Sequence, residues 1–214
     1  YVSGYGEKGP DKDLPGFDFT AYFARGGVMG TMYDVDSMPM TPIAGFGDHQ
    51  VGLYLASGII AALYRARETG KGDQVTVSLY HTALWDISLY LQCSQYGDVS
   101  TQFPISRKHI ANPLNVSHKT KDDKWIQIAM PRYDFHYPLF MKVIERLIDD
   151  ARFYPQVNLQ NNLDEFYAIL DAEIGKYTLK EMCARMDEAD LPYAVCQTWD
   201  QILEDPQAWG SDAL

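Results

Sequence analysis

The chain has 214 residues, of which 46% are hydrophobic and 22% are charged, which is enough apolar mass for one large or two small folded domains. Its net charge of -11 and pI near 4.7 argue against nucleic acid or an anionic membrane as a partner, because both select clustered Lys and Arg. An anionic small ligand would need a local basic pocket.

Residues 1–97 have the pattern of an α/β domain. A strand, a crossover containing helices and a second strand in this order predict a parallel sheet. The expected elements are a strand end at 1–3, a glycine- and proline-rich loop at 4–15, a helix at 17–28, a loop at 30–47, a helix at 51–64, a strand at 74–79 and a helix at 80–95.

The helix at 51–64 is almost wholly apolar, which predicts burial on all sides. It falls short of the roughly 20 residues that cross a bilayer, so we expect a core helix rather than a membrane span. Basic residues at 65–67 and Gly70 give it the expected end signals. Asp48 stands just before this run, after the turn Gly45-Phe46-Gly47, and is predicted to be its N-cap.

Asp48 therefore has two interpretations. An aspartate at a helix start can simply accept hydrogen bonds from the first free amides. The same carboxylate, presented by a glycine-hinged turn, can instead carry chemistry. The neighbouring His49 does not by itself imply an Asp–His couple, since successive helical residues point about 100° apart.

After residue 97 the periodicity fades, and residues 98–123 are expected to be a linker. Residues 124–197 predict a smaller α+β domain, and residues 198–214 the start of a return to the large domain. The elements expected after the linker are a strand at 125–129, helices at 135–147, 163–174 and 179–189, a strand at 193–196 and a helix before Asp205-Pro206. Capping pairs are expected at Asn162/Glu165, Thr178/Glu181 and Thr198/Gln201.

Several familiar sites are not indicated. The loop at 3–10 lacks the glycine spacing of nucleotide-binding loops and is better explained as a surface loop. The histidines have no metal-ligand spacing, so no metal site is expected. No Gly-x-Ser-x-Gly occurs. The acidic cluster at 187–190 is typical of a solvated helix end.

Cysteines and termini add further expectations. Cys93, Cys183 and Cys196 form no close pair, which predicts reduced thiols rather than disulfides or zinc ligands and favours a cytoplasmic protein. No targeting segment is recognisable. The chain starts without Met inside a strand, so we expect a piece of something longer.

A series of short motifs extends over nearly the whole chain. In chain order they are Ser3-Gly4-Tyr5-Gly6, Gly9-Pro10, Pro15-Gly16-Phe17-Asp18, Gly47-Asp48, Ala61-Ala62-Leu63-Tyr64-Arg65, Thr69-Gly70-Lys71-Gly72, Val75-Thr76-Val77-Ser78-Leu79, Asn112-Pro113-Leu114, Asp123-Lys124-Trp125-Ile126 and Glu204-Asp205-Pro206-Gln207. Together these motifs resemble the family III CoA-transferases, which include formyl-CoA and carnitine CoA-transferases. The similarity is greatest to the 2-hydroxyacid (phenyllactate or 2-hydroxyisocaproate) CoA-transferases.

The resemblance implies that Asp48 is the nucleophile. It would attack an acyl-CoA thioester to form a mixed anhydride and then an aspartyl-CoA thioester, from which CoA passes to a small carboxylic acid. No tightly bound cofactor or metal is required, because coenzyme A thioester is itself the substrate. The CoA- and substrate-binding positions implied by the family pattern are Phe17, Gly45, Phe46, Gly47, His49 and Leu79.

The resemblance also implies the architecture. The fold would be α/β, with a Rossmann-like parallel-sheet large domain, a smaller α+β domain and two chains interlocked as a homodimer. Upstream and C-terminal parts of the large domain would lie outside this chain, and they would contain the residues that bind the CoA phosphates.

Two alternatives stay open. The α-methylacyl-CoA racemases share this fold, but they place a histidine where this chain has Phe17, which cannot transfer a proton. The second alternative is a non-catalytic binding fragment that cannot assemble a complete site.

Overall fold

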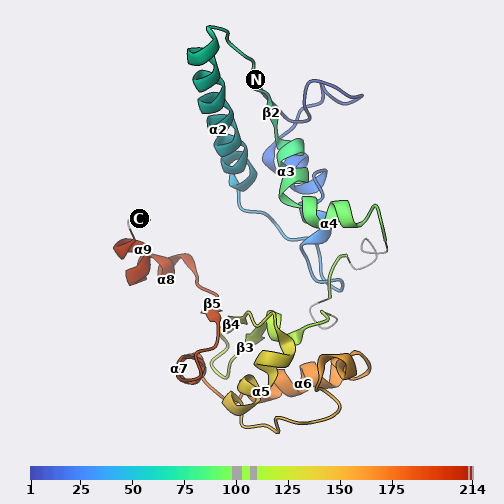
Figure 1. The fold of residues 1–214 in the computed structure, drawn as a ribbon, viewed down its shortest axis with the longest axis vertical. Coiled ribbons are helices and arrows are strands. Elements are labelled where there is room, and N and C mark those ends of the chain that lie inside the picture. Colours follow the sequence, from blue (N-terminus) through green and yellow to red (C-terminus); the bar gives the residue numbers. More distant parts are fainter. Residues whose placement is uncertain (98–102, 107–109, 212, 214) are drawn as a thin grey trace. The chain divides into compact units, whose positions relative to one another are not determined.

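The structure is a computed structural model that describes residues 1–97, 103–106, 110–211 and 213. It divides into two compact units, residues 1–106 and 107–214 (Figure 1). Each unit combines helices with a small sheet, so the mixed α/β class expected from the sequence is confirmed.

The first unit contains a two-stranded parallel sheet. Val2 of β1 pairs with Val77 of β2, and Ser3 pairs with Ser78, as the strand–crossover–strand order predicts. Both strands are shorter than expected. β1 covers residues 2–3 of the expected 1–3, and β2 covers residues 77–78 of the expected 74–79. The elements are β1 (Val2–Ser3), the π-helix η1 (Asp18–Ala24), α1 (Val28–Thr31), α2 (Phe46–Thr69), β2 (Val77–Ser78), α3 (Leu79–Asp86) and α4 (Ser88–Cys93).

The long helix α2 differs from the prediction in its burial. It ends at Gly70 in the left-handed conformation (φ 69°), as expected, but only Gly47 and Val51 are buried along its length. Ile60 is 69% exposed and Leu63 is 60% exposed. Within this unit α2 packs against η1, α3 and β2 (Figure 1), and these elements leave the rest of its surface uncovered. The prediction of a helix buried all round was wrong for this chain.

The core of the first unit lies where η1, the first turns of α2 and α3 meet. Ser78 caps α3 by accepting a hydrogen bond from the amide of His81 at 3.1 Å. The buried apolar residues of this core are Ala21, Tyr22, Phe23, Val28, Val51, Leu79 and Ala83.

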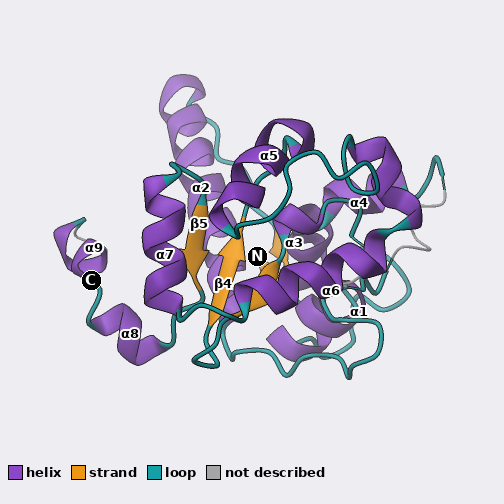
Figure 2. Cartoon of the chain, turned by 90° about the horizontal axis from the view of Figure 1, so that it is seen from below, coloured by secondary structure: helices purple, strands orange, loops and turns teal. Residues whose placement is uncertain are grey.

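The second unit contains a three-stranded antiparallel sheet in the order β3-β4-β5 (Figure 2). Ser117 pairs with Gln127, and Ile128 pairs with Tyr193. The elements are η4 (Pro113–Asn115), β3 (Ser117–Lys119), β4 (Trp125–Ile128), α5 (Tyr133–Val143), η5 (Gln156–Asn161), α6 (Leu163–Ile174), α7 (Leu179–Glu188), β5 (Tyr193–Val195), α8 (Trp199–Leu203) and α9 (Pro206–Gly210).

The segment expected as a linker, 98–123, differs in its second half. Both η4 and β3 fall inside it and belong to the second unit, because β3 forms the edge of the sheet beside β4. Residues 98–102 and 107–109 lie outside the described residues. A three-residue strand has too little periodicity to be recognised without its partner strand.

The predicted caps have mixed outcomes. Capping boxes form at Thr178 with Glu181, before α7, and at Thr198 with Gln201, before α8. Asn162 makes no side-chain cap on α6, so that prediction was wrong. The side-chain Nδ2 of Asn162 donates to the carbonyls of Arg152 and Asn158 instead.

The core of the second unit is larger than that of the first. Buried apolar residues of β4, α5, α6 and α7 contribute to it. Phe140 and Ile144 lie in it. Leu147, the last residue of the helix expected at 135–147, is 73% exposed, because α5 ends at Val143. Among the described residues, no helix is long and apolar enough to cross a membrane.

Candidate active site

Asp48 is the third residue of α2 and not its N-cap, which corrects the prediction. The N-cap is Gly45, whose φ of 84° lies in the left-handed region that glycine adopts readily. The carbonyl of Gly45 accepts the amide of His49 at 2.9 Å and so begins the helix. Asp48 lies three residues after Gly45 and is exposed.

The side-chain cap of α2 comes from Asp18, at the start of η1. Asp18 Oδ2 accepts the amide of Gly45 at 2.7 Å, and Oδ1 accepts the amide of Gly47 at 3.0 Å. Asp18 is only 7% exposed. A carboxylate that accepts from helix-start amides satisfies donors that the helix itself leaves unpaired. The capping function expected of Asp48 therefore belongs to Asp18.

The side chain of Asp48 makes no hydrogen bond or ion pair with any residue that the structure describes. It lines a cavity of about 390 Å³ together with apolar and small residues. None of the described lining residues is a Lys or Arg, and Asp48 is the one acidic side chain among them. The lining residues are Val2, Ser3, Gly4, Gly16, Asp48, Val51, Gly52, Leu55 and Leu79.

Two backbone segments meet at the edge of this cavity. A Cβ built on Gly4 would lie 2.6 Å from Cα of Gly16, closer than real side chains approach. Only glycine fits at this crossing of the loop after β1 and the loop before η1. The hydroxyl of Ser3 accepts the amide of Gly6 at 2.9 Å and closes the turn that follows β1.

The ring of Tyr22 packs against Gly47, in the turn before Asp48. A Cβ on Gly47 would lie within 3.0 Å of both the Tyr22 ring and Asp18 Oδ1. The Tyr22 hydroxyl donates to Asp86 Oδ2 at 2.7 Å, and Tyr54 of α2 donates to Asp86 Oδ1 at 3.0 Å. Burial, and then the hydrogen bond to Asp86, raise the pKa of Tyr22, so it remains a donor.

The other predicted pocket residues fall into two groups. Leu79, the first residue of α3, lines the cavity beside Asp48. Gly45 and Phe46 form the turn that leads to Asp48 but are not among the lining residues. Phe17 precedes η1 with its side chain 69% exposed, and His49 is exposed on α2, also outside the lining.

Four residues around Asp48 were not predicted to belong to the site: Asp18, Ser3, Gly4 and Gly16. All four stand in the short motifs quoted above, so a signal existed in the pattern Pro15-Gly16-Phe17-Asp18. Their shared position around Asp48 could not be deduced, because they are distant from it along the chain.

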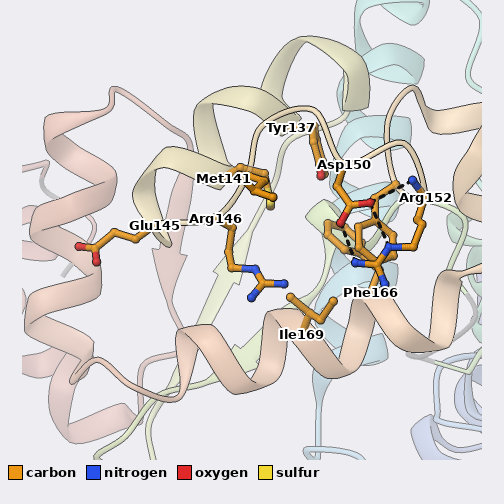
Figure 3. A pocket seen from close by; sticks show the side chains of 10 residues that line it. Tyr137, Met141, Glu145, Arg146, Asp150, Arg152, Phe166 and Ile169 are labelled. Atoms are coloured by element: carbon orange, nitrogen blue, oxygen red, sulfur yellow. Dashed lines mark hydrogen bonds and ion pairs between the residues drawn. The ribbon is translucent and has the colours of Figure 1, made fainter.

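A second cavity, also about 390 Å³, lies within the second unit and holds none of the predicted site residues (Figure 3). Arg152 donates to Asp150 on one side of it, through Nη2 at 2.7 Å and Nε at 3.0 Å. Arg152 thereby lowers the pKa of Asp150. Tyr137 adjoins this cavity; its buried hydroxyl has no hydrogen-bond partner among the described residues, and burial raises its pKa to about 12.

Among the residues that the structure describes, no group of three His, Cys, Asp or Glu side chains is placed to hold a metal ion. Cys93, Cys183 and Cys196 are free thiols there.

Two proteins with sequences similar to this chain are both named CoA-transferases. The chain is 46% identical over its whole length to the cinnamoyl-CoA:phenyllactate CoA-transferase of Clostridium sporogenes, covering 52% of that protein. It is 42% identical to the (R)-2-hydroxy-4-methylpentanoate CoA-transferase of Clostridioides difficile, covering 53% of it. The chain therefore spans about half the length of these relatives.

Solved structures share the fold. Rv3272 from M. tuberculosis superimposes with a TM-score of 0.81 at 22% identity, over 99% of this chain and 55% of that one. A CAIB/BAIF family protein from Brucella suis gives a TM-score of 0.77 at 21% identity, over 98% of this chain and 55% of its own. The model of CoA-transferase family III matches residues 1–212, and the chain thus belongs to CoA-transferase family III.

Proposed function

We propose that the protein containing this chain is a CoA-transferase in which Asp48 is the nucleophile. It moves CoA from an acyl-CoA donor to a small carboxylic acid. The observation that carries the proposal is that two aspartates near the start of α2 have different surroundings. Asp18 caps the turn, and Asp48 keeps both carboxylate oxygens unpaired within the described structure at the edge of a cavity.

The chemistry follows from a carboxylate placed in this way. Asp48 attacks the thioester carbonyl; a C–O bond forms, the C–S bond breaks and CoA thiolate leaves, which gives a mixed anhydride. The thiolate then attacks the Asp48 carbonyl and releases the donor acid. The acceptor carboxylate attacks the aspartyl-CoA thioester, the C–S bond breaks to release CoA thiolate again, and a second anhydride forms. This thiolate attacks the acceptor's acyl carbonyl in the anhydride, which gives the new acyl-CoA and regenerates the Asp48 carboxylate.

The substrate class is a 2-hydroxy acid with an apolar side chain. The named relatives act on phenyllactate and on 2-hydroxy-4-methylpentanoate, and both acids have bulky apolar groups. Val2, Val51, Leu55 and Leu79 give the cavity apolar walls that match such groups. Coenzyme A enters as a thioester substrate, and the reaction needs no resident cofactor, because one activated acyl group replaces another.

The wider architecture belongs to the same proposal. Residues 1–97 form the central part of a Rossmann-like large domain, residues 124–197 together with η4 and β3 form the small domain, and residues 198–214 begin the return to the large domain. The complete protein is a cytoplasmic homodimer of interlocked chains. The apolar surface left uncovered on α2 in this chain supports a larger domain around it.

Two competing functions are less well supported. A racemase needs an acid–base group on each face of the substrate carbon, and Phe17 supplies none at the position where a histidine would be required. A purely binding function predicts neither transfer activity nor a hydroxamate at Asp48, and the experiment below tests both.

The test is trapping of the intermediate in the full-length protein. It would be incubated with cinnamoyl-CoA, phenyllactate and hydroxylamine, and peptides containing residue 48 would be analysed by mass spectrometry. We expect a hydroxamate at Asp48 in the wild type, and neither hydroxamate nor transfer in Asp48→Ala. Transfer activity retained by Asp48→Ala would refute the proposed function.

A further inference from the structure

The carboxylate of Asp18 is a buried charge whose described hydrogen-bond partners are backbone amides. At 7% exposure it accepts from Gly45 at 2.7 Å and from Gly47 at 3.0 Å. No Lys or Arg pairs with it among the described residues. Hydrogen bonds to an ionised acceptor are stronger than those between neutral groups, so this link holds the turn firmly.

Both glycines are required by the geometry of this link. Gly45 adopts φ 84°, which orients its amide toward Oδ2 of Asp18. A Cβ at Gly47 would approach within 3.0 Å of Oδ1 of Asp18. A side chain at position 45 would strain the left-handed backbone, and a side chain at position 47 would collide with the Asp18 carboxylate.

The link determines where Asp48 lies. Gly47 immediately precedes Asp48, so the bond to Asp18 Oδ1 fixes the backbone one residue away from the nucleophile. The next fixed bond, from the amide of His49 to the carbonyl of Gly45, encloses Asp48 on its other side. The Asp48 backbone is held from both sides while its carboxylate stays unpaired within the described structure.

We propose that Asp18 is a positioning residue for the Asp48 nucleophile, acting through the amides of Gly45 and Gly47. This inference rests on the proposed function of Asp48 and adds a second aspartate to its site. Asp18 itself is poorly placed to act as a nucleophile, because it is buried and each of its oxygens accepts a backbone amide.

The test uses the full-length protein and the Asp18→Asn variant. Asparagine keeps the shape, but only one of its two terminal atoms can accept a hydrogen bond, so at least one amide loses its partner. Misplacement of a reacting group by about 1 Å costs on the order of 10²-fold in rate. We expect the single-turnover rate of hydroxamate formation at Asp48 to fall on the order of 10²-fold, with little change in KM for cinnamoyl-CoA.

Gly47→Ala serves as a second variant, because it displaces the same turn while leaving the Asp18 charge intact. The double variant should lose little more than the worse single variant, since both changes disrupt one link. Asp122→Asn is the matched control. It removes a carboxylate that accepts the amide of Leu179 at 2.8 Å in the second unit, away from Asp48 along the chain. We expect it to leave the single-turnover rate unchanged.

The outcomes separate the two proposals. If Asp18→Asn and Gly47→Ala acylate Asp48 at the wild-type rate, or lose rate only in proportion to the folded fraction measured by circular dichroism, Asp18 is not a positioning residue. In that case the proposed function still stands, provided that Asp48→Ala is inactive and unlabelled. An active Asp48→Ala variant refutes the function itself.

Discussion

The hydroxyl of Tyr22 donates a 2.7 Å hydrogen bond to Oδ2 of Asp86, while the ring of Tyr22 lies against Gly47. One side chain of η1 thus connects α3 to the turn that precedes Asp48. The same Asp86 accepts from Tyr54 on α2, so three helices share one carboxylate.

Removing this hydroxyl should destabilise the first unit without removing any apolar packing. Tyr22→Phe leaves the buried ring in place and deletes a hydrogen bond to an ionised acceptor. Because Asp86 is exposed, we expect the loss to be at the lower end for such bonds, about 1 kcal/mol in the free energy of unfolding.

Urea denaturation of the full-length protein would measure this change. Tyr64→Phe is the control, because Tyr64 is 70% exposed and the structure gives its hydroxyl no hydrogen bond to a described residue. Equal stabilities of the two variants would contradict the importance of the Tyr22–Asp86 bond.

The capping box before α7 should contribute measurably to the stability of the second unit. The Thr178 hydroxyl accepts the amide of Glu181 at 3.3 Å, and Glu181 Oε2 accepts the amide of Thr178 at 2.8 Å. Thr178→Ala should cost about 1 kcal/mol in thermal or urea unfolding. Lys180→Ala, an exposed substitution in the same turn, should cost nothing; a similar loss from both would argue against the cap.

Asp122 should make the second unit sensitive to acid. The amide of Leu179, followed by the hydroxyl of Thr120, lowers the pKa of Asp122 from 3.8 to about 2. A carboxyl whose pKa is lower in the folded than in the unfolded protein stabilises the fold above its unfolded pKa, and that stabilisation is lost as the pH falls through the folded pKa.

The difference in unfolding midpoint between wild type and Asp122→Asn should therefore be constant above about pH 4 and shrink between 3.8 and about 2. Denaturation curves over a pH series would measure it. A difference that did not change with pH would show that Asp122 contributes through shape and not through charge.

The exposed apolar face of α2 should have different effects in the 214-residue chain and in the full-length protein. In the 214-residue chain alone, Ile60 and Leu63 are mostly exposed, and exposed apolar patches promote association. Replacing both by Ser should reduce self-association of this chain, measured by light scattering. In the full-length protein, where we propose that the rest of the large domain covers α2, the same change should destabilise the fold by several kcal/mol.

Glu68→Ser, further along the same helix and also exposed, is the control for this pair and should change neither property much. If the Ile60 and Leu63 changes left the full-length protein as stable as the control did, the proposed covering of α2 would be wrong.

Local chemistry determined much of this protein from the sequence alone. The periodicity of residues 163–174 coincides with α6, and Thr178 with Glu181 predicted the cap of α7. Gly70 ends α2 in the left-handed conformation, as its position predicted. These features succeed because their hydrogen bonds and apolar contacts lie within a few residues along the chain.

Tertiary structure decided what depends on distant partners. The sequence pattern predicted that Asp48 caps α2. The side chain that caps α2 is instead Asp18, 27 residues before Gly45 along the chain. Residues 117–119 gave no strand signal until β4 was available to pair with them. The apolar composition of α2 predicted burial, but burial requires neighbours, and composition does not say where they are. The carboxylate of Asp48, unpaired within the described structure, is likewise a property of the assembled turn, because only folding brings Asp18 to the amides of Gly45 and Gly47.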